Sequence, residues 1–316
     1  MKQICGILVL VLLVFQSCEK RPSKHRLIVS TDIGGSDPDD YQSLVHLLLY
    51  ADTLDIVGLV SSPPYGGRKE QILETIAVYE KDFLALSKHS EQYPFPEYLR
   101  SITAQGLTDT QNSSLPDTSL SDGAKLIIAE ADKVDERPLY ILVWGSITDL
   151  AQAIHHKPEI KSKIRTYSIG SWNTVQDSLA RNYVYHEHPD LWLIENNSTF
   201  RGMYMGGYQK SDFGNESFIS SSVRPYGNLG QFLYDKKADI KMGDTPSVLY
   251  LLNGDPSNPE LESWGGRFQK AEHGPHYWTD LRDSSQIENG RFVARTVNKW
   301  RKHYLEDWKR RMQYLE

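Results

Sequence analysis

The sequence predicts an α/β fold in which helices flank a mostly parallel, Rossmann-like central sheet. Short apolar segments of strand character alternate with longer segments in which apolar residues recur at helical spacing. Such alternation is typical of parallel sheets that helices cover on both faces. Polar or glycine-rich residues follow three of the predicted strands, and ligands of these folds bind outside the carboxyl ends of strands.

The first half of the chain supplies the clearest elements. Residues 27–30 and 55–60 are short apolar runs, which predict strands. Residues 41–51 crowd leucine and valine on one side, which predicts a helix between these strands. Residues 70–86 place apolar residues at near-helical spacing and predict a second helix.

The next segments continue the alternation. Residues 90–120 are rich in Pro, Ser, Thr, Asp and Gln, which predicts a long loop with short helical turns. Helices are then expected at residues 122–131 and from residues 150–154 onward. Strands are expected at Leu139–Val143 and at residues 166–169.

The C-terminal part is irregular and rich in aromatic residues from about residue 175. Its last stretch, residues 298–314, is charged and aromatic and predicts a terminal helix packed on the surface. The sequence contains no clear linker and no internal repeat, so we expect residues 27–316 to form one domain.

The N-terminus has the pattern of a secretory signal over residues 1–17. Lys2 supplies a positive charge, and residues 7–15 form an apolar core too short to span a bilayer. Cys18 then follows Ser17, which resembles a bacterial lipoprotein signal, although Phe15 stands where Leu is usual. We expect Cys18 to be lipidated and residues 18–26 to tether the domain to the bacterial envelope, at its periplasmic face or the cell surface. The alternative is an ordinary secreted protein.

Composition excludes several classes of function. Apart from Cys18 the only cysteine is Cys5, inside the signal, so the mature chain has neither an internal disulfide nor a thiolate metal site. Removing residues 1–17 takes away Lys2 and lowers the formal net charge from −6 to −7, which argues against a nucleic-acid partner. No later segment is long and apolar enough to cross a membrane, so membrane contact is expected only through the lipid anchor.

The most informative feature is a strand-to-helix turn that carries four aspartates within nine residues: Asp32, Asp37, Asp39 and Asp40. No Lys or Arg lies between Arg26 and Arg68, so the local chain supplies no countercharge. A hard divalent cation with oxygen ligands would supply it.

Simpler interpretations of this turn explain less. Asp39 and Asp40 could cap the following helix and Asp32 could be a turn residue, which accounts for some of the acids but not for all four. A phosphate-binding loop would need Gly-Lys-Ser/Thr, and the turn has no lysine. An aspartyl phosphotransfer site would place two acids one residue apart directly after the strand, whereas Ile33 and Gly34 follow Asp32.

The turn resembles the N-terminal signature of the inosine–uridine-type nucleoside hydrolases, Asp-x-Asp-Pro-Gly-x-Asp-Asp. It looks closest to an exported nucleoside hydrolase-like family of unassigned function that includes a cellulose-binding protein. Asp32, Asp39 and Asp40 match three of the acids, Ser30 replaces the first, and the glycine loop is two residues longer. The longer loop leaves it open whether Asp37 or Asp39 takes the matching role.

Two later segments support the resemblance, which covers roughly residues 27–280. Residues 142–151 resemble the family's Gly-x-Leu-Thr-Asn-Leu-Ala segment, where the carbonyl before the glycine, here that of Trp144, is a calcium ligand. The run from Gly243 to Pro246 resembles the segment that supplies the last metal carboxylate, here Asp244. The family often has a histidine where this chain has Gly243. Residues 197–204 and 264–268 look typical of the exported subfamily.

The resemblance implies a calcium-dependent hydrolase of N-glycosidic, ribosyl-type or related glycosidic bonds. Asp32, Asp40, the Trp144 carbonyl and Asp244 would hold Ca²⁺, and Asp39 would bind a sugar hydroxyl. Asp32 would act as general base on a water whose pKa the metal lowers. No covalent intermediate is needed, so the expected outcome is inversion at the anomeric carbon.

Other residues are weaker candidates for substrate binding. Asn173 follows a predicted strand and could line the sugar pocket, although a solvent-exposed position explains an asparagine there equally well. Tyr65, Trp144 and Trp172 could stack on a base or sugar, or they could fill the core. Residues 90–120 and 205–235 match no pattern that would name the leaving group.

Histidines offer no clear site. His186 and His188 invite a zinc interpretation, but two histidines in a predicted loop without a third ligand nearby are more often solvated. His273 or His276 could protonate the leaving group, although core or surface positions are more common for such residues.

Two functions therefore remain from the sequence. The first is the hydrolase, acting on a small molecule or a glycan. The second is a surface lipoprotein that binds glycans and keeps the calcium site without turnover. The four matched acids favour the hydrolase, and the replacements at Ser30 and Gly243 favour the binding protein. Related hydrolases commonly form homo-oligomers, which the sequence leaves open.

Overall fold

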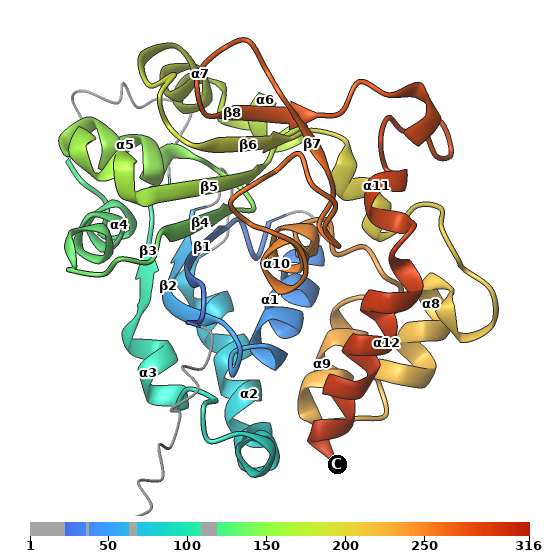
Figure 1. The fold of residues 1–316 in the computed structure, drawn as a ribbon. Helices are drawn as coiled ribbons and strands as arrows, with labels where there is room; N and C mark the ends of the chain where they lie inside the picture. The colour runs from blue at the N-terminus through green and yellow to red at the C-terminus, as the bar shows by residue number, and fades with distance from the viewer. Residues whose placement is uncertain (1–22, 36–37, 63–67, 109–118) are drawn as a thin grey trace, which may run out of the picture.

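A computed structural model describes residues 23–35, 38–62, 68–108 and 119–316. The predictions for the signal segment, Cys18, Asp37 and Tyr65 lie outside the described residues and stay predictions. Within those residues, the chain folds around one mixed sheet with helices packed against both faces (Figure 1).

The sheet has the strand order β3-β2-β1-β4-β5-β6-β8-β7. Neighbouring strands are parallel except β7, which pairs antiparallel with β8 at one edge. The predicted fold class is therefore confirmed. The strands are β1 (Arg26–Thr31), β2 (Asp55–Ser61), β3 (Thr103–Gln105), β4 (Leu139–Val143), β5 (Ile164–Ile169), β6 (Leu193–Asn196), β7 (Phe268–Lys270) and β8 (Tyr277–Asp280).

More helices pack on one face of the sheet than on the other, and the larger layer includes helices from the C-terminal part of the chain (Figure 1). On one face lie α4 (Asp122–Asp132), α5 (Thr148–His156) and α7 (Ser178–Glu187). The other layer is built mainly from α1 (Asp39–Leu49), α2 (Lys69–His89), α9 (Gly227–Lys236), α10 (Thr245–Leu252) and α12 (Arg301–Met312). Shorter helices are α3 (Pro96–Ser101), α6 (Trp172–Gln176), α8 (Asn215–Phe218) and α11 (Arg295–Asn298).

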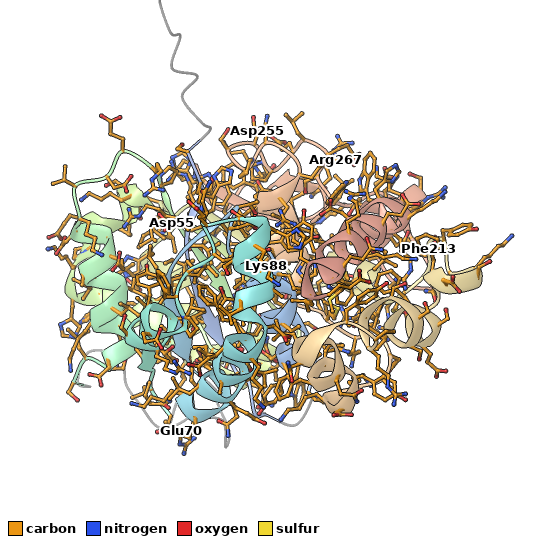
Figure 2. All side chains as sticks on the ribbon, turned by 90° about the horizontal axis from the view of Figure 1, so that it is seen from below. Asp55, Glu70, Lys88, Phe213, Asp255 and Arg267 are labelled. Atoms are coloured by element: carbon orange, nitrogen blue, oxygen red, sulfur yellow. The ribbon has the colours of Figure 1, made fainter. Side chains whose placement is uncertain are left out.

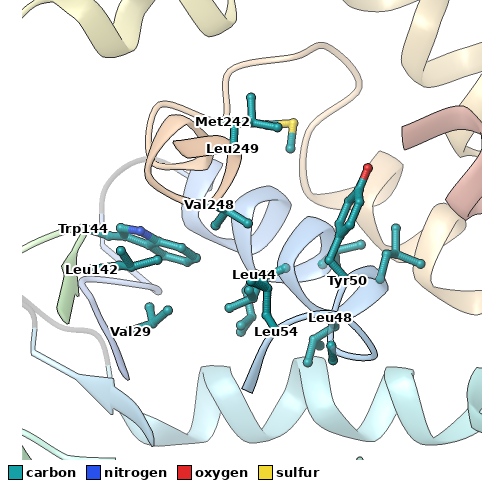
Figure 3. Close-up of a cluster of buried hydrophobic side chains, with 14 of the residues drawn as sticks. Val29, Leu44, Leu48, Tyr50, Leu54, Leu142, Trp144, Met242, Val248 and Leu249 are labelled. Carbon is teal, nitrogen blue, oxygen red and sulfur yellow. The ribbon is translucent and has the colours of Figure 1, made fainter. Parts of the chain in front are cut away.

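The buried strand β1 shows why both faces need cover. Leu27 and Val29 pack into the cluster beneath α1, whereas Ile28, which points the other way, packs into the cluster beneath α4 and α5. Leu44 and Leu48 of α1 close the first cluster (Figure 3). A central parallel strand that is buried along its whole length, as β1 is, needs a helical layer on each face.

Helix α2 lies at the edge of this layer and is longer than predicted. It begins at Lys69 and ends at His89, with Glu70 near one end and Lys88 near the other (Figure 2). An acid in the first turn and bases in the last turn both interact favourably with the helix dipole.

The region after residue 175 is more regular than the sequence indicates. It contributes α7 through α12 and the strands β6, β7 and β8. These strands are only three or four residues long, and β6 and β8 each end in polar residues. The prediction missed them because so short a run does not develop a periodic pattern. The edge strand β3 was missed for the same reason.

The terminal helix predicted at residues 298–314 is confirmed as α12, which begins after the short α11 ends at Asn298. One side of α12 is buried more deeply than a helix lying on the surface requires. Tyr304, Leu305 and Trp308 are fully buried there, so the charged residues of this segment form only its outer side. None of the helices in the described ranges combines the length and apolar character that a membrane span requires.

Candidate active site

The strand order places the candidate site at the switch point of the sheet. Strand β1 has β2 on one side and β4 on the other, so the chain builds outward in opposite directions from these central strands. Ser30 pairs with Val143 across β1 and β4, so both strands end at the same level. Asp32 and Trp144 follow these ends and therefore flank the crevice where α/β folds bind ligands.

A pocket of about 200 Å³ opens at this edge. Its lining comes from the ends of β1, β4 and β5, the start of α1, the segment after β6 and the segment before α10. The lining residues are Asp32, Gly35, Asp39, Asp40, Trp144, Ile169, Gly170, Ser171, Trp172, Asn173, Phe200, Arg201, Tyr204, Lys241, Gly243 and Asp244.

Four carboxylates line the pocket: Asp32, Asp39, Asp40 and Asp244. Asp32 sits in a turn closed by a hydrogen bond from the Gly35 amide to the Asp32 carbonyl, at 2.9 Å. Gly34 takes a φ of +88° there, which a side chain would oppose. Asp39 and Asp40 form the first turn of α1, and the residue at the N-cap is Pro38. Neither aspartate caps the helix, so the capping interpretation is wrong.

Asp40 and Asp244 are the two most buried of these acids. Burial raises the pKa of the Asp40 carboxyl well above its ordinary value, and the charges of the three neighbouring carboxylates raise it further. Thr31 donates a hydrogen bond to Asp40, which acts in the opposite direction. The pocket therefore disfavours the ionised form of Asp40.

The peptide after β4 approaches Asp32 very closely. A Cβ at Gly145 would lie 2.6 Å from the Asp32 Cβ, so only glycine fits beside this carboxylate. The amide of Asn173 donates to the Trp144 carbonyl at 2.7 Å and to the Ile169 carbonyl at 3.2 Å. Asn173 thus joins the ends of β4 and β5, and the second lone pair of the Trp144 carbonyl stays available for another partner.

The Trp144 ring does not face a ligand. It is buried in the core (Figure 3), and its Nε1 donates to the Ser247 hydroxyl at 2.7 Å. The stacking role considered for this ring is therefore wrong. The ring instead fixes the start of α10, and with it Asp244, against the end of β4.

Trp172 differs from Trp144 because its side chain is 65% exposed at the edge of the pocket. Ser171, just before it, has a φ of +59°, an unfavourable conformation for a residue with a side chain. The Ser171 amide donates to the Asn197 side chain at 2.7 Å, which holds this turn in place. The turn directs Trp172 outward and Asn173 toward the pocket.

Two cations on the pocket wall were missed from the sequence: Arg201 and Lys241. Arg201 lies in the 3-10 helix Thr199–Met203 after β6, and Lys241 precedes the segment of Asp244. The expectation that the acidic turn lacks a countercharge holds only locally, because the fold brings these cations from distant segments. Residues 197–204 carried a family pattern without a role for Arg201, and no motif marks Lys241.

The histidines considered above lie away from the pocket. His186 and His188 are at the end of α7 and its C-cap, not in a loop, and His188 is buried against Tyr183. His273 stacks on Tyr185, and His276 lines a separate groove. No histidine occurs among the described residues that line the pocket.

The donor types fit a hard cation, although the carboxylates are not closed around one. Calcium prefers oxygen ligands, and the pocket offers them from the Trp144 carbonyl and from three neighbouring acids, Asp32, Asp40 and Asp244. Yet in the described part of the chain no three His, Cys, Asp or Glu side chains are already arranged to hold a metal ion. A cation here would need main-chain, water or substrate oxygens as well.

A family model describes most of this architecture. The model named cellulose-binding Sde182, nucleoside hydrolase-like domain, matches residues 26–268. The chain belongs to this family. No curated protein gave a significant match to the sequence.

The solved structures that resemble this Sde182-like chain include nucleoside hydrolases and a related protein. A nucleoside hydrolase-related hypothetical protein from Saccharophagus degradans, described as associated with carbohydrate metabolism, is 27% identical, with a TM-score of 0.73 over 93% of this chain and 72% of the other. The inosine-uridine preferring nucleoside hydrolase of Bacillus anthracis is 15% identical, with a TM-score of 0.52 over 92% and 100%. The purine-preferring ribonucleoside hydrolase of Gardnerella vaginalis is 14% identical, with a TM-score of 0.51 over 92% of this chain and 98% of the other. The last two show the shared fold.

Ser30 and Gly243 are the two positions at which this Sde182-like chain departs from the nucleoside hydrolase pattern, and both lie in close-packed surroundings. Ser30 is buried inside β1, and its hydroxyl has no hydrogen-bond partner among the described residues. A Cβ at Gly243 would lie 3.2 Å from the Phe200 ring, so Phe200 occupies the space beside this position. A histidine at 243 would therefore need Phe200 to move.

Proposed function

We propose that the protein is a calcium-dependent hydrolase of an N-glycosidic, ribosyl-type or related glycosidic bond. The observation that carries the proposal is the convergence of Asp32, Asp39, Asp40 and Asp244 on one pocket at the switch point of a nucleoside hydrolase-like sheet. Carbohydrate binding alone does not require so many buried or half-buried acids in one place.

Each side chain of the pocket has a role that follows from its position. Asp32 takes a proton from the attacking water as general base, because it is fixed directly after β1 and packs against Gly145. Asp39 accepts a hydrogen bond from a sugar hydroxyl. Asp40 and Asp244 stabilise the positive charge that develops on the sugar ring. Asn173 orients the Trp144 carbonyl, and Trp172 stacks on the sugar or the leaving group.

Calcium would be held by Asp32, Asp40, Asp244 and the Trp144 carbonyl, completed by water and a sugar diol. Bound there, it supplies positive charge that orders sugar hydroxyls and makes a nearby water more acidic. The reaction is a single displacement, so the product has inverted anomeric configuration. Retention of configuration would contradict this route.

A glycan-binding protein without turnover is the alternative. Two observations favour it: the described pocket lining contains no histidine to protonate a leaving group, and the acids are not arranged as a complete metal site. The family description names a cellulose-binding protein. In this case the acids would grip sugar hydroxyls.

One experiment separates the two functions. The purified protein is incubated with a panel of nucleosides and p-nitrophenyl glycosides, with calcium or with a chelator, and binding to insoluble polysaccharides is measured in parallel. Turnover that the chelator abolishes supports the hydrolase. No turnover of any substrate together with measurable polysaccharide binding would remove it.

We also propose that the protein acts at the bacterial envelope, anchored by a lipid on Cys18. The support is the short apolar segment of residues 7–15 followed by Ser17 and Cys18. Metabolic labelling with a fatty acid should mark the wild-type protein, and Cys18→Ser should remove the label. Labelling that survives this change would place the lipid elsewhere.

A further inference from the structure

One buried carboxylate, that of Asp177, has no part in the chemistry proposed above. Asp177 lies between α6 and α7 and is 2% exposed. It accepts a hydrogen bond from the Ser146 hydroxyl at 2.5 Å, and the Thr148 hydroxyl lies 2.9 and 2.8 Å from its two oxygens. Burial raises the pKa of the Asp177 carboxyl to about 6, and these hydroxyls and the backbone amides of Ile147 and Thr148 act in the opposite direction.

All of these donors belong to residues 144–148, which we call the β4–α5 turn. Two of them are backbone amides at the start of α5, where amides have no partner within the helix. A carboxylate only accepts hydrogen bonds, so both oxygens of Asp177 suit a turn that presents only donors. An asparagine of the same shape would direct an NH₂ group toward some of these donors. The contact therefore depends on the acid and not only on the size of the side chain.

The other side of the β4–α5 turn lies against the candidate site. A Cβ at Gly145 would be 2.6 Å from the Asp32 Cβ. Trp144 lines the pocket, and its carbonyl accepts a hydrogen bond from Asn173 at 2.7 Å. Asn173 and Asp177 both belong to the segment after β5, so this segment holds the turn at two points. A shift of the turn would move the Trp144 carbonyl and the surface against which Asp32 packs.

We propose that Asp177 is a positioning residue of the site: its carboxylate holds the β4–α5 turn, and the turn fixes Asp32 and the Trp144 carbonyl. Asp177 is not part of the pocket lining, so it acts only through this turn. The inference rests on the proposed hydrolase, in which the general base must be held in place. A misplacement of about 1 Å can lower a rate by about 100-fold.

Hydrogen–deuterium exchange of the protein in chelator tests whether Asp177 holds Asp32 through the turn. In Asp177→Asn we expect the amides of residues 144–148 to exchange about tenfold or more faster than in the wild type. The Gly35 amide, which donates to the Asp32 carbonyl, should also exchange faster. Unchanged exchange at Gly35 would overturn the proposal, whether or not residues 144–148 exchange faster.

A second variant and a control separate positioning from a general loss of stability. Thr148→Val removes one hydroxyl and keeps Asp177, so it should give the same pattern with smaller changes if Asp177→Asn does not fold. Asp82 is the matched control: it is also a buried acid, and it accepts from the backbone amides of Asn228 and Leu229 at 2.9 and 2.7 Å, outside the pocket lining. Asp82→Asn should leave exchange at the site unchanged. Equal loosening of the site in Asp82→Asn would contradict the proposal.

Calcium affinity and kinetics connect this position to function. Asp177→Asn should raise the calcium Kd about tenfold in calorimetry and lower kcat more than it raises KM, whereas Asp82→Asn should change neither. Wild-type values of both in Asp177→Asn would overturn the proposed role. The exchange experiment needs neither calcium nor turnover. A wild-type protein that neither binds calcium nor hydrolyses any substrate would therefore refute the hydrolase, while exchange at Gly35 would still decide whether Asp177 positions Asp32.

Discussion

Asp32 is the residue on which the proposed chemistry depends most directly. Asp32 directly follows the central strand β1, and its side chain packs against Gly145. The carboxylate is therefore held in one position. A base held in one place contributes about 10²–10⁴-fold to rate in other enzymes. The nearly isosteric change to asparagine removes the base and keeps the shape.

We therefore expect Asp32→Asn to lower kcat at least about 100-fold. Activity against a nucleoside or glycoside found active in the panel is the measurement. Asp212→Asn, which alters an exposed acid outside the pocket lining, is the control and should retain full activity. An Asp32→Asn variant with wild-type kcat would exclude Asp32 as the base.

Asp40 poses a different question, because its charge is unfavourable in the metal-free protein. Burial and the neighbouring acids raise the pKa of this carboxyl, so keeping it ionised at neutral pH lowers the stability of the folded state. Asparagine at this position keeps an oxygen for the Thr31 hydrogen bond and removes the charge.

Asp40→Asn should therefore raise the melting temperature in chelator by a few degrees. Calcium at about 100 times its Kd should stabilise the wild type by about 2.7 kcal/mol and the variant far less. Thermal unfolding with calcium and with chelator measures both effects. A wild-type protein whose melting temperature does not respond to millimolar calcium would contradict the proposed metal site.

The sequence revealed the acidic residues of the site but not the basic ones. The acids share a nine-residue turn, and a turn after an apolar strand can be recognised without tertiary information. Arg201 and Lys241 are far apart in the chain, and each stands in a segment with no chemical pattern of its own. Only the packing of the segment after β6 beside the segment before α10 brings them together.

At the scale of elements, the start of α1 holds the segment that precedes α10. Gln42 is fully buried, and its amide nitrogen donates to the carbonyls of Lys237 and Asp239 at 3.1 and 2.9 Å. Its side-chain oxygen accepts from the amides of Lys241 and Met242 at 3.1 and 3.3 Å. One side chain thus fixes the backbone that carries Lys241 and leads to Asp244.

Gln42→Leu should destabilise the protein by on the order of 3 kcal/mol, because buried backbone groups lose their partners. It should also weaken sugar binding, because Lys241 and Asp244 lose their support. Urea unfolding and calorimetry measure the two effects, and Gln92→Leu on the exposed surface is the matched control. Wild-type stability in Gln42→Leu would show that this contact is dispensable.

The prediction of elements succeeded where the pattern was long and failed where it was short. Leu139–Val143 was predicted with its observed bounds because five buried apolar residues in a row stand out. β6 and β8 are four residues each and contain Glu195 and Asp280, so their sequences do not resemble buried strands. Pairing with β5 and with each other, rather than local propensity, makes them strands.

At the scale of the whole molecule, one buried histidine links folding to pH. His46 of α1 is almost completely buried, with its ring 4.8 Å from that of Tyr50 and 5.3 Å from that of Trp308. Burial, assisted by the charge of Arg311, lowers the pKa of His46 to about 3. In the unfolded chain a histidine has a pKa of about 6.5. Between these values the unfolded state binds a proton that the folded state does not.

The contribution of neutral, buried His46 to the free energy of unfolding should therefore be fully present above pH 6.5 and should decline as the pH falls below this value. Well below that value the contribution of His46 approaches about 1.4 kcal/mol per pH unit. His46→Phe removes the titrating group and keeps an aromatic ring among its neighbours, so its stability should fall less steeply between pH 6 and pH 5, a window that lies within about 3 to 6.5.

The measurement is urea unfolding of both proteins across this range, with His303→Phe on the exposed side of α12 as the control for loss of a histidine. The slope of the wild type should exceed that of His46→Phe by roughly 1 kcal/mol per pH unit. Parallel slopes for the two proteins would mean that His46 becomes protonated within the folded molecule. That outcome would require solvent to reach the interface between α1 and α12, which the packing of Trp308 against this ring opposes.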